Sequence, residues 1–155
     1  MGESEWKHAS WVSGIGKWAW IIGLLNGILG LLFSIIQVVT YAAVWAIGGF
    51  GVFTGVPGVP GAGLSFWNVI ASIVGIIIAI FIIRPKFSNP CGEKDWEALY
   101  GWALKLGGAR VPWMFIWGIL LFMFGWYGWG GIAVLLPAIM IIFAGPRKYE
   151  WSSGE

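Results

Sequence analysis

The stretch WAWIIGLLNGILGLLFSIIQVVTYAAVWAI, Trp18 to Ile47, decides the fold because it contains no charged residue. As a helix it would be about 45 Å long, which exceeds the roughly 30 Å hydrocarbon core of a bilayer. We therefore expect a transmembrane helix that tilts or projects from the membrane. The segment before it carries Glu3 and Glu5 rather than the basic start of a signal peptide, so we expect an uncleaved first span.

Three further apolar runs follow the first. LSFWNVIASIVGIIIAIFII, Leu64 to Ile83, is about one bilayer crossing long. The segment Val111–Gly145 holds two more runs, Trp113–Trp126 and Ile132–Ala144, on either side of the glycine-rich turn YGWGG. Each of these is near the lower length limit for a span, and a re-entrant hairpin is the competing interpretation. Pro137 lies inside the fourth run and should kink it.

The composition supports a membrane location. Hydrophobic residues make up 59% of the chain and charged residues 10%, compared with about 45–50% and about 25% in average proteins. The 13 Trp and 25 Gly residues are types that favour membrane interfaces and transmembrane helices, respectively. The net charge of +2 is too small to indicate a nucleic-acid partner.

The distribution of charge predicts an orientation. Every Lys, Arg, Asp and Glu lies in residues 3–17, 84–110 or 147–155, whereas the connections 48–63 and 127–131 carry no charge. In a four-span chain the charged segments then share one side of the membrane. The positive-inside rule assigns that side, with both termini, to the cytoplasm. In a prokaryote the membrane would be the cytoplasmic membrane.

The two halves of the chain have similar ends, which favours a degenerate tandem repeat. RPKF at 84–87 follows the second run and PRKY at 146–149 follows the fourth. EWKHASW at 5–11 precedes the first run and DWEALYGW at 95–102 precedes the third. Basic residues suit the negative end of a helix dipole, and we expect each proline to stop its helix.

The charged loop 84–110 is expected to carry a short helix. Apolar residues recur there at helical spacing: Trp96, Leu99, Tyr100, Ala103 and Leu106. This pattern predicts an amphipathic helix that lies at the membrane interface. Its first turn would hold the acidic residues, which the helix dipole favours there, and the glycine pair at 107–108 would end it.

Catalytic, cofactor and metal sites are not expected in this chain. Glu93, Asp95 and Glu97 have no histidine nearby and their spacing fits no metal loop. His8 is the only histidine and Cys91 the only cysteine, so we interpret Cys91 as a plain cytosolic thiol rather than a nucleophile or a lipidation site. The four runs contain no ionisable residue other than tyrosine, which argues against a proton-coupled or ion-coupled carrier but leaves an uncoupled pore open.

Small and polar residues form a seam with heptad-like spacing on the first two runs. Its residues are Gly23, Gly27, Gly30, Ser34 and Gln37 on the first run and Asn68, Ser72, Gly75 and Ala79 on the second. Small residues let membrane helices approach, and Ser, Asn and Gln form hydrogen bonds between them. We expect the seam to pack the two helices together, with contacts to a second copy or another membrane protein as the alternative.

The aromatic residues at the ends of the two runs predict how the seam is aligned. Trp18, Trp20 and Arg84 would mark the inner interface, and Trp45 and Trp67 the outer one. An antiparallel pair aligned in this way brings Gly30 near Gly75 and Ala79. It also brings Gln37 near Asn68 and Ser72, so we predict a hydrogen bond from Gln37 to one of these two residues.

These observations predict an all-α integral membrane protein with four transmembrane helices arranged as two hairpins. Its segments are the cytoplasmic residues 1–17, a hairpin at 18–83 with the outer loop 48–63, the cytoplasmic loop 84–110, a hairpin at 111–146 and the cytoplasmic tail 147–155. We expect a non-catalytic structural, scaffolding or accessory subunit that acts through helix packing. An oligomeric channel or uncoupled transporter is the alternative. The expected partners are the lipid bilayer and either a second copy or another membrane protein.

Overall fold

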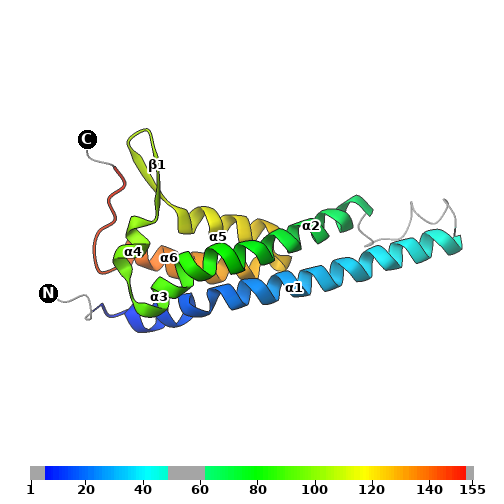
Figure 1. Ribbon diagram of the computed structural model, residues 1–155, viewed down its shortest axis with the longest axis horizontal. Coiled ribbons are helices and arrows are strands. Elements are labelled where there is room, and N and C mark those ends of the chain that lie inside the picture. The colour runs from blue at the N-terminus through cyan, green and yellow to red at the C-terminus, as the bar shows by residue number, and fades with distance from the viewer. Residues whose placement is uncertain (1–5, 49–61, 153–155) are drawn as a thin grey trace.

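The computed structural model describes residues 6–48 and 62–152 of the chain. Four helices run side by side along its long axis: α1 (Ala9–Gly48), α2 (Ala62–Ile78), α5 (Trp113–Phe124) and α6 (Trp129–Ala144) (Figure 1). Four short elements gather at one end of this bundle: α3 (Asn89–Glu93), α4 (Trp96–Gly101), β1 (Ala103–Leu106) and β2 (Ala109–Pro112). We call these elements, with residues 145–152, the polar end. The predicted outer loop lies almost entirely outside the described residues, as do Glu3 and Glu5.

Helix length supports three of the four expected spans. Among the described residues, three helical segments are long and apolar enough to cross a membrane: Ala9–Ala43, Phe66–Glu93 and Trp126–Ala144. The helical class of the fold is thereby confirmed. With 12 residues, α5 is shorter than these segments, because the chain turns at Gly125 before it reaches the roughly 17 residues that a span needs.

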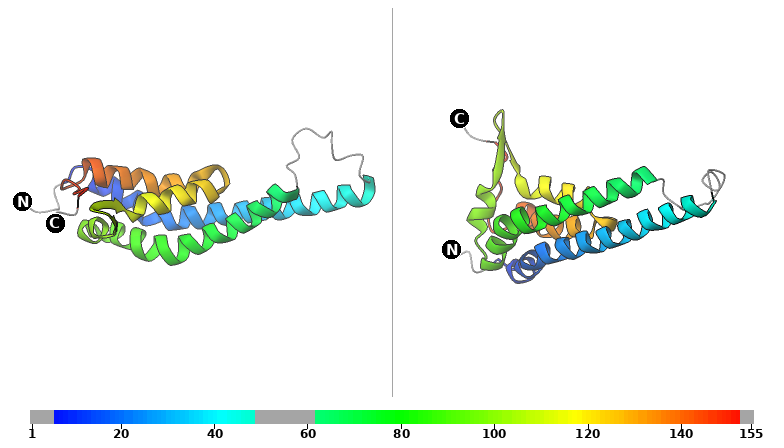
Figure 2. Two further views of the ribbon diagram at one scale, coloured as in Figure 1. Left: turned by 90° about the horizontal axis from the view of Figure 1, so that it is seen from above. Right: turned by 45° about the vertical axis from the view of Figure 1, so that its right-hand side comes forward.

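The helices differ greatly in length. α1 has 40 residues and corresponds to about 60 Å, whereas the 16 residues of α6 correspond to about 24 Å. The hairpin of α5 and α6 therefore covers only the part of α1 nearest the polar end, and α1 and α2 project past it (Figure 2). At the tip of the hairpin Trp126 stacks on Phe33, with the ring centroids 4.6 Å apart.

The second apolar run continues as a π-helix, η3 (Ala79–Ser88), directly after α2. The prediction that Pro85 stops the helix is wrong, because η3 passes through this residue. The backbone N–H of Asn89 donates to the carbonyl of Arg84, five residues earlier, as a π-helix requires. In the fourth run the helix also continues through Pro137, and α6 ends at Ala144, before Pro146.

The loop after η3 corrects the predicted extent of the amphipathic helix, which was expected to continue through Ala103 and Leu106. From Asp95 to Leu106 only Trp96–Gly101 is helical, and the chain then forms the antiparallel pair β1–β2. Gly107 and Gly108 join the strands with φ values of 50° and 88°. A two-residue hairpin turn of type I′ needs positive φ at both positions, which glycine adopts without steric cost. The glycine pair therefore makes a strand hairpin instead of ending a helix.

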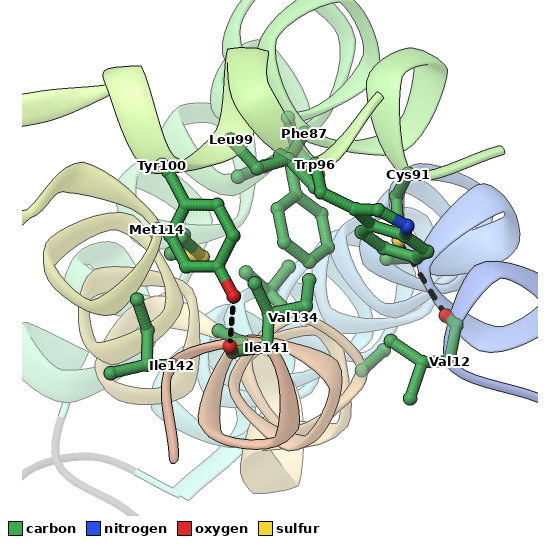
Figure 3. Packing of buried hydrophobic residues seen from close by; sticks show 14 of the residues in the cluster. Val12, Phe87, Cys91, Trp96, Leu99, Tyr100, Met114, Val134, Ile141 and Ile142 are labelled. Atoms are coloured by element: carbon green, nitrogen blue, oxygen red, sulfur yellow. Dashed lines mark hydrogen bonds between the residues drawn. The ribbon is translucent and has the colours of Figure 1, made fainter. Parts of the chain in front are cut away.

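The buried core includes α4, which was expected to lie among lipid headgroups. Trp96, Leu99 and Tyr100 are 1%, 0% and 2% exposed, respectively. They pack with Phe87 of η3 and with residues of α5 and α6 (Figure 3). The apolar face of α4 was predicted correctly, but protein covers it because the ends of the long helices converge beside it.

Candidate functional site

The seam between α1 and α2 depends on glycines that have no room for a side chain. A Cβ placed on Gly27 would lie 2.6 Å from Cγ1 of Ile76 and 3.2 Å from the carbonyl oxygen of Ser72. A Cβ on Gly30 would lie 2.7 Å from Oγ of Ser72. These distances are shorter than ordinary van der Waals contacts, so the two backbones lie as close as glycine permits.

The alignment of the seam differs from the predicted one. Gly30 faces Ser72 instead of Gly75 and Ala79, and Ala79 faces Gly23, where an added Cβ would lie 3.4 Å from the Cβ of Ala79. At the end predicted to face inward, the expected pair does meet, because the Arg84 guanidinium lies 4.7 Å from the centre of a Trp20 ring. The error came from the outer marker Trp67, whose ring lies 5.8 Å from Phe124 at the hairpin tip.

The polar residues of the seam do not bond across it as predicted. Ser34 donates its Oγ hydrogen to the carbonyl of Gly30 in its own helix, at 2.6 Å. Asn68 is exposed. Oε1 of Gln37 is buried and has no hydrogen-bond partner within the described part of the chain, so the predicted bond to Asn68 or Ser72 is absent between these residues. Gln37 thus retains an unsatisfied acceptor.

A second face of α1, which the sequence pattern did not reveal, packs against α6. Asn26 is 6% exposed. A Cβ on Gly130 of α6 would lie 3.0 Å from Cα of Gly23 and 3.4 Å from Nδ2 of Asn26. Gly118 plays the same part between α5 and α6, where a Cβ would lie 2.7 Å from Leu135. Gly130 belongs to YGWGG, which we interpreted as a turn, although it lies within α6.

Tyr100 joins α4 to the end of α6 at the polar end. Its hydroxyl donates to the carbonyl oxygen of Ile141 at 2.8 Å (Figure 3). It also donates to the carbonyl oxygen of Arg147 at 3.0 Å. The last carbonyls of a helix lack partners in the helix itself, and this hydroxyl supplies one. The Arg147 guanidinium covers the ring at 4.8 Å and pairs with Glu97, with Nη1 2.7 Å from Oε1.

The segment after α6 adds to the β1–β2 hairpin. The backbone N–H of Arg110 donates to the carbonyl of Trp151 at 2.8 Å, and Ala109 pairs with Ser152. Tyr149, which is 5% exposed, donates to the carbonyl of Arg110 at 3.4 Å. The polar end is therefore a folded unit in which α4, the β1–β2 hairpin and the segment after α6 are joined by hydrogen bonds.

Three residues that we considered as catalytic or metal-binding candidates form hydrogen bonds within the fold. Asp95 caps α4 by accepting from the N–H of Ala98 at 3.0 Å. His8 accepts from the indole N–H of Trp11 at 3.2 Å. Cys91 is 0% exposed, and its thiol donates to the carbonyl of Val12 at 3.5 Å (Figure 3). The thiol of Cys91 therefore packs against α1 rather than facing solvent.

Neither the geometry nor comparison with known proteins identifies a reaction. Within residues 6–48 and 62–152, no group of three or more His, Cys, Asp or Glu side chains could hold a metal ion. No family model, no curated protein and no solved structure matches this chain. What the described residues offer chemically is close helix packing, a folded charged end and apolar helix faces.

Proposed function

We propose that the protein is a non-catalytic membrane protein with four membrane-inserted helices, and that it acts as a structural, scaffolding or accessory subunit through helix packing. The observation that carries this proposal is the outer arm, by which we mean residues 32–43 of α1 and 66–73 of α2. The arm lies past most of the α5–α6 hairpin (Figure 2). It exposes large apolar side chains: Leu32, Ile35, Ile36, Val39, Phe66, Ile70 and Ile73.

The fourth span is supported by the tip of the α5–α6 hairpin. Trp126, Tyr127 and Trp129 are exposed there, and Trp and Tyr favour the membrane–water interface. Tyr127 has a positive φ of 53° inside the turn. Irregular backbone of this kind needs water or protein partners, which the hydrocarbon does not provide. A tip that reaches the outer interface meets both requirements, and α5 and α6 then both cross.

The orientation is supported by the location of charge. The charged residues of the described chain lie at the polar end or near it, in residues 7–17, 84–110 and 147–150. The start of α1 and the segment after α6 also lie at this end (Figure 1). By the positive-inside rule this end faces the cytoplasm.

The proposal is tested by native mass spectrometry of the full chain in mild detergent. We expect the 17.0 kDa chain to appear in a complex of fixed stoichiometry with a second copy or a different membrane protein. A photo-cross-linking side chain at Ile36 in the outer arm should join the partner. The same group at Phe122, which is exposed on the hairpin, is the matched control. A monomer whose Ile36 derivative cross-links only to lipid would overturn the proposal.

The second candidate is an oligomeric channel or uncoupled transporter, and the buried acceptor of Gln37 favours it. An amide oxygen without a partner in hydrocarbon is unfavourable by several kcal/mol, roughly, and a shared water-filled axis would satisfy it. Under this alternative the purified protein would conduct ions or small solutes in planar bilayers, and Gln37→Leu would change the conductance. Silent bilayers that contain correctly folded oligomers would exclude the alternative.

A further inference from the structure

A cleft of about 430 Å³ opens where α1, η3 and α3 meet. Its walls include two cations, Lys17 and Arg84, two indoles, Trp18 and Trp20, one amide, Asn89, and one carboxylate, Glu93. We propose that this cleft binds the phosphate headgroup of an anionic phospholipid in the inner leaflet. The inference rests on the proposed membrane location, although not on the proposed partner.

The two cations of the cleft have no ion-pair partner in the described part of the protein. Among the described residues the ion pairs are Arg110–Glu150 and Arg147–Glu97. Arg84 instead lies 4.7 Å from the centre of a Trp20 ring, and Lys17 Nζ lies 5.9 Å from that of Trp18. An arginine held on an aromatic face still presents its N–H groups at the ring edge, and both residue types bind phosphate oxygens.

The walls of the cleft hold the two cations in place. Ser88 of η3 accepts from the backbone N–H of Trp20 at 3.2 Å, which fixes η3 beside α1. A Cβ on Gly92 would lie 3.2 Å from Cγ of Lys17, so the stem of Lys17 packs closely along α3. Arg84 belongs to the π-helical segment, and π-helical turns occur frequently at functional sites.

The position of the cleft suits a lipid better than a dissolved anion. Trp18 and Trp20 are typical of the membrane–water interface. Exposed apolar residues continue from the cleft along both helices at helical spacing. They are Ile22, Leu25, Ile28 and Leu32 on α1, and Phe81, Ile77 and Ile73 on η3 and α2. Acyl chains attached to a phosphate in the cleft would lie along these side chains.

The charge of the cleft favours an anionic headgroup. The lining holds two cations and one carboxylate, so positive charge exceeds negative charge there. A zwitterionic choline lipid brings its own quaternary ammonium group close to Lys17 and Arg84. An anionic lipid such as phosphatidylglycerol presents the phosphate without that opposing charge, so it should bind more tightly.

The test is native mass spectrometry of the full chain in detergent with added phosphatidylglycerol or phosphatidylcholine. The wild-type protein should bind phosphatidylglycerol more tightly, and Lys17→Gln with Arg84→Gln should weaken this binding about tenfold. The matched control is Lys105→Gln with Lys148→Gln, which removes two exposed cations of the polar end outside the cleft. The control should bind as the wild type does.

Three results would overturn the inference. Equal losses in the cleft variant and its control would mean that only overall charge attracts the lipid. Equal binding of the two lipids, or displacement of phosphatidylglycerol by millimolar inorganic phosphate, would mean that the cleft does not select an anionic lipid. If the double variant unfolds, Lys17→Gln alone gives the same comparison at an exposed side chain. The same spectra report the oligomeric state. If the wild-type protein binds phosphatidylglycerol but appears only as a monomer, the proposed function would be contradicted and the lipid site would not.

Discussion

Tyr100 illustrates how single residues hold the polar end together. Its hydroxyl satisfies carbonyls of α6 and of the segment that follows. Tyr100→Phe should lower the free energy of unfolding by about 1–3 kcal/mol, because two carbonyls lose their donor. Tyr149→Phe is the matched control with a longer bond, 3.4 Å, and should lose less. Denaturant unfolding followed by tryptophan fluorescence measures both, and equal losses would contradict the assigned role.

The same hydroxyl makes stability sensitive to alkaline pH. Burial raises the pKa of Tyr100 above its ordinary value of 10.0, against the opposing effect of Arg147. The folded state therefore holds the proton more tightly, and this contribution is complete below about pH 10, the ordinary tyrosine pKa. It is lost as pH rises through the raised pKa. Unfolding measured from about pH 8 to pH 11 should show a steeper decline for wild type than for Tyr100→Phe. Parallel curves would contradict this.

The glycines of the seam are not equivalent, although the sequence pattern treats them alike. Gly27→Ala should lower the free energy of unfolding by about 1–3 kcal/mol, because the new Cβ would overlap Ile76 and approach the backbone at Ser72. Gly75→Ala is the control, since no described atom would lie within 4 Å of its Cβ. It should be neutral, or stabilising by up to about 1 kcal/mol through helix propensity. A tolerated Gly27→Ala would mean that α2 does not pack where the structure has it.

At the scale of elements, α4 is the clearest departure from the sequence pattern. Leu99→Glu should lower the free energy of unfolding by at least about 2–5 kcal/mol, the loss expected for truncating a buried leucine, because a carboxyl must also be buried. Leu106→Glu, at a position 57% exposed, should be nearly neutral. Detergent-titration unfolding of both variants gives the comparison. If both variants lose equally little free energy of unfolding, α4 would instead lie at the membrane interface, as the sequence pattern predicted.

The sequence predicted the elements better than their contacts. The uncharged runs predicted α1 and α2 because twenty or so apolar residues have few alternatives to a membrane helix. The spacing around Leu99 identified an apolar face, but the same pattern fits lipid and protein as its cover. The stripe at Gly23 and Gly27 identified a packing surface, but not that Gly23 also meets α6. LKLGGAR held an overlooked local signal, since two glycines between short runs favour a hairpin.

At the scale of the whole molecule, the orientation in the membrane is testable with cysteines introduced at exposed positions. Ser152→Cys at the polar end should stay unlabelled by an impermeant maleimide in intact cells and react after lysis. Tyr127→Cys at the hairpin tip, a position 76% exposed, should react before lysis. Wild-type Cys91 is buried and serves as the silent control. The opposite pattern of labelling would mean that the protein has the inverse orientation in the membrane. If Tyr127→Cys stays unlabelled before lysis, the hairpin would be re-entrant rather than spanning.

The unequal lengths of α1 and the α5–α6 hairpin have a consequence for the lipid around them. Lipid beside a helix of about 60 Å and lipid beside one of about 24 Å cannot both keep their relaxed thickness. If α5 and α6 both cross, as we propose, the bilayer must thin beside the hairpin, and this hydrophobic mismatch has an elastic cost. Two copies that share one thinned patch deform less lipid than two separate copies. Energy transfer between labelled copies in vesicles should therefore decrease as the acyl chains are shortened, and an unchanged signal would exclude mismatch as a cause of association.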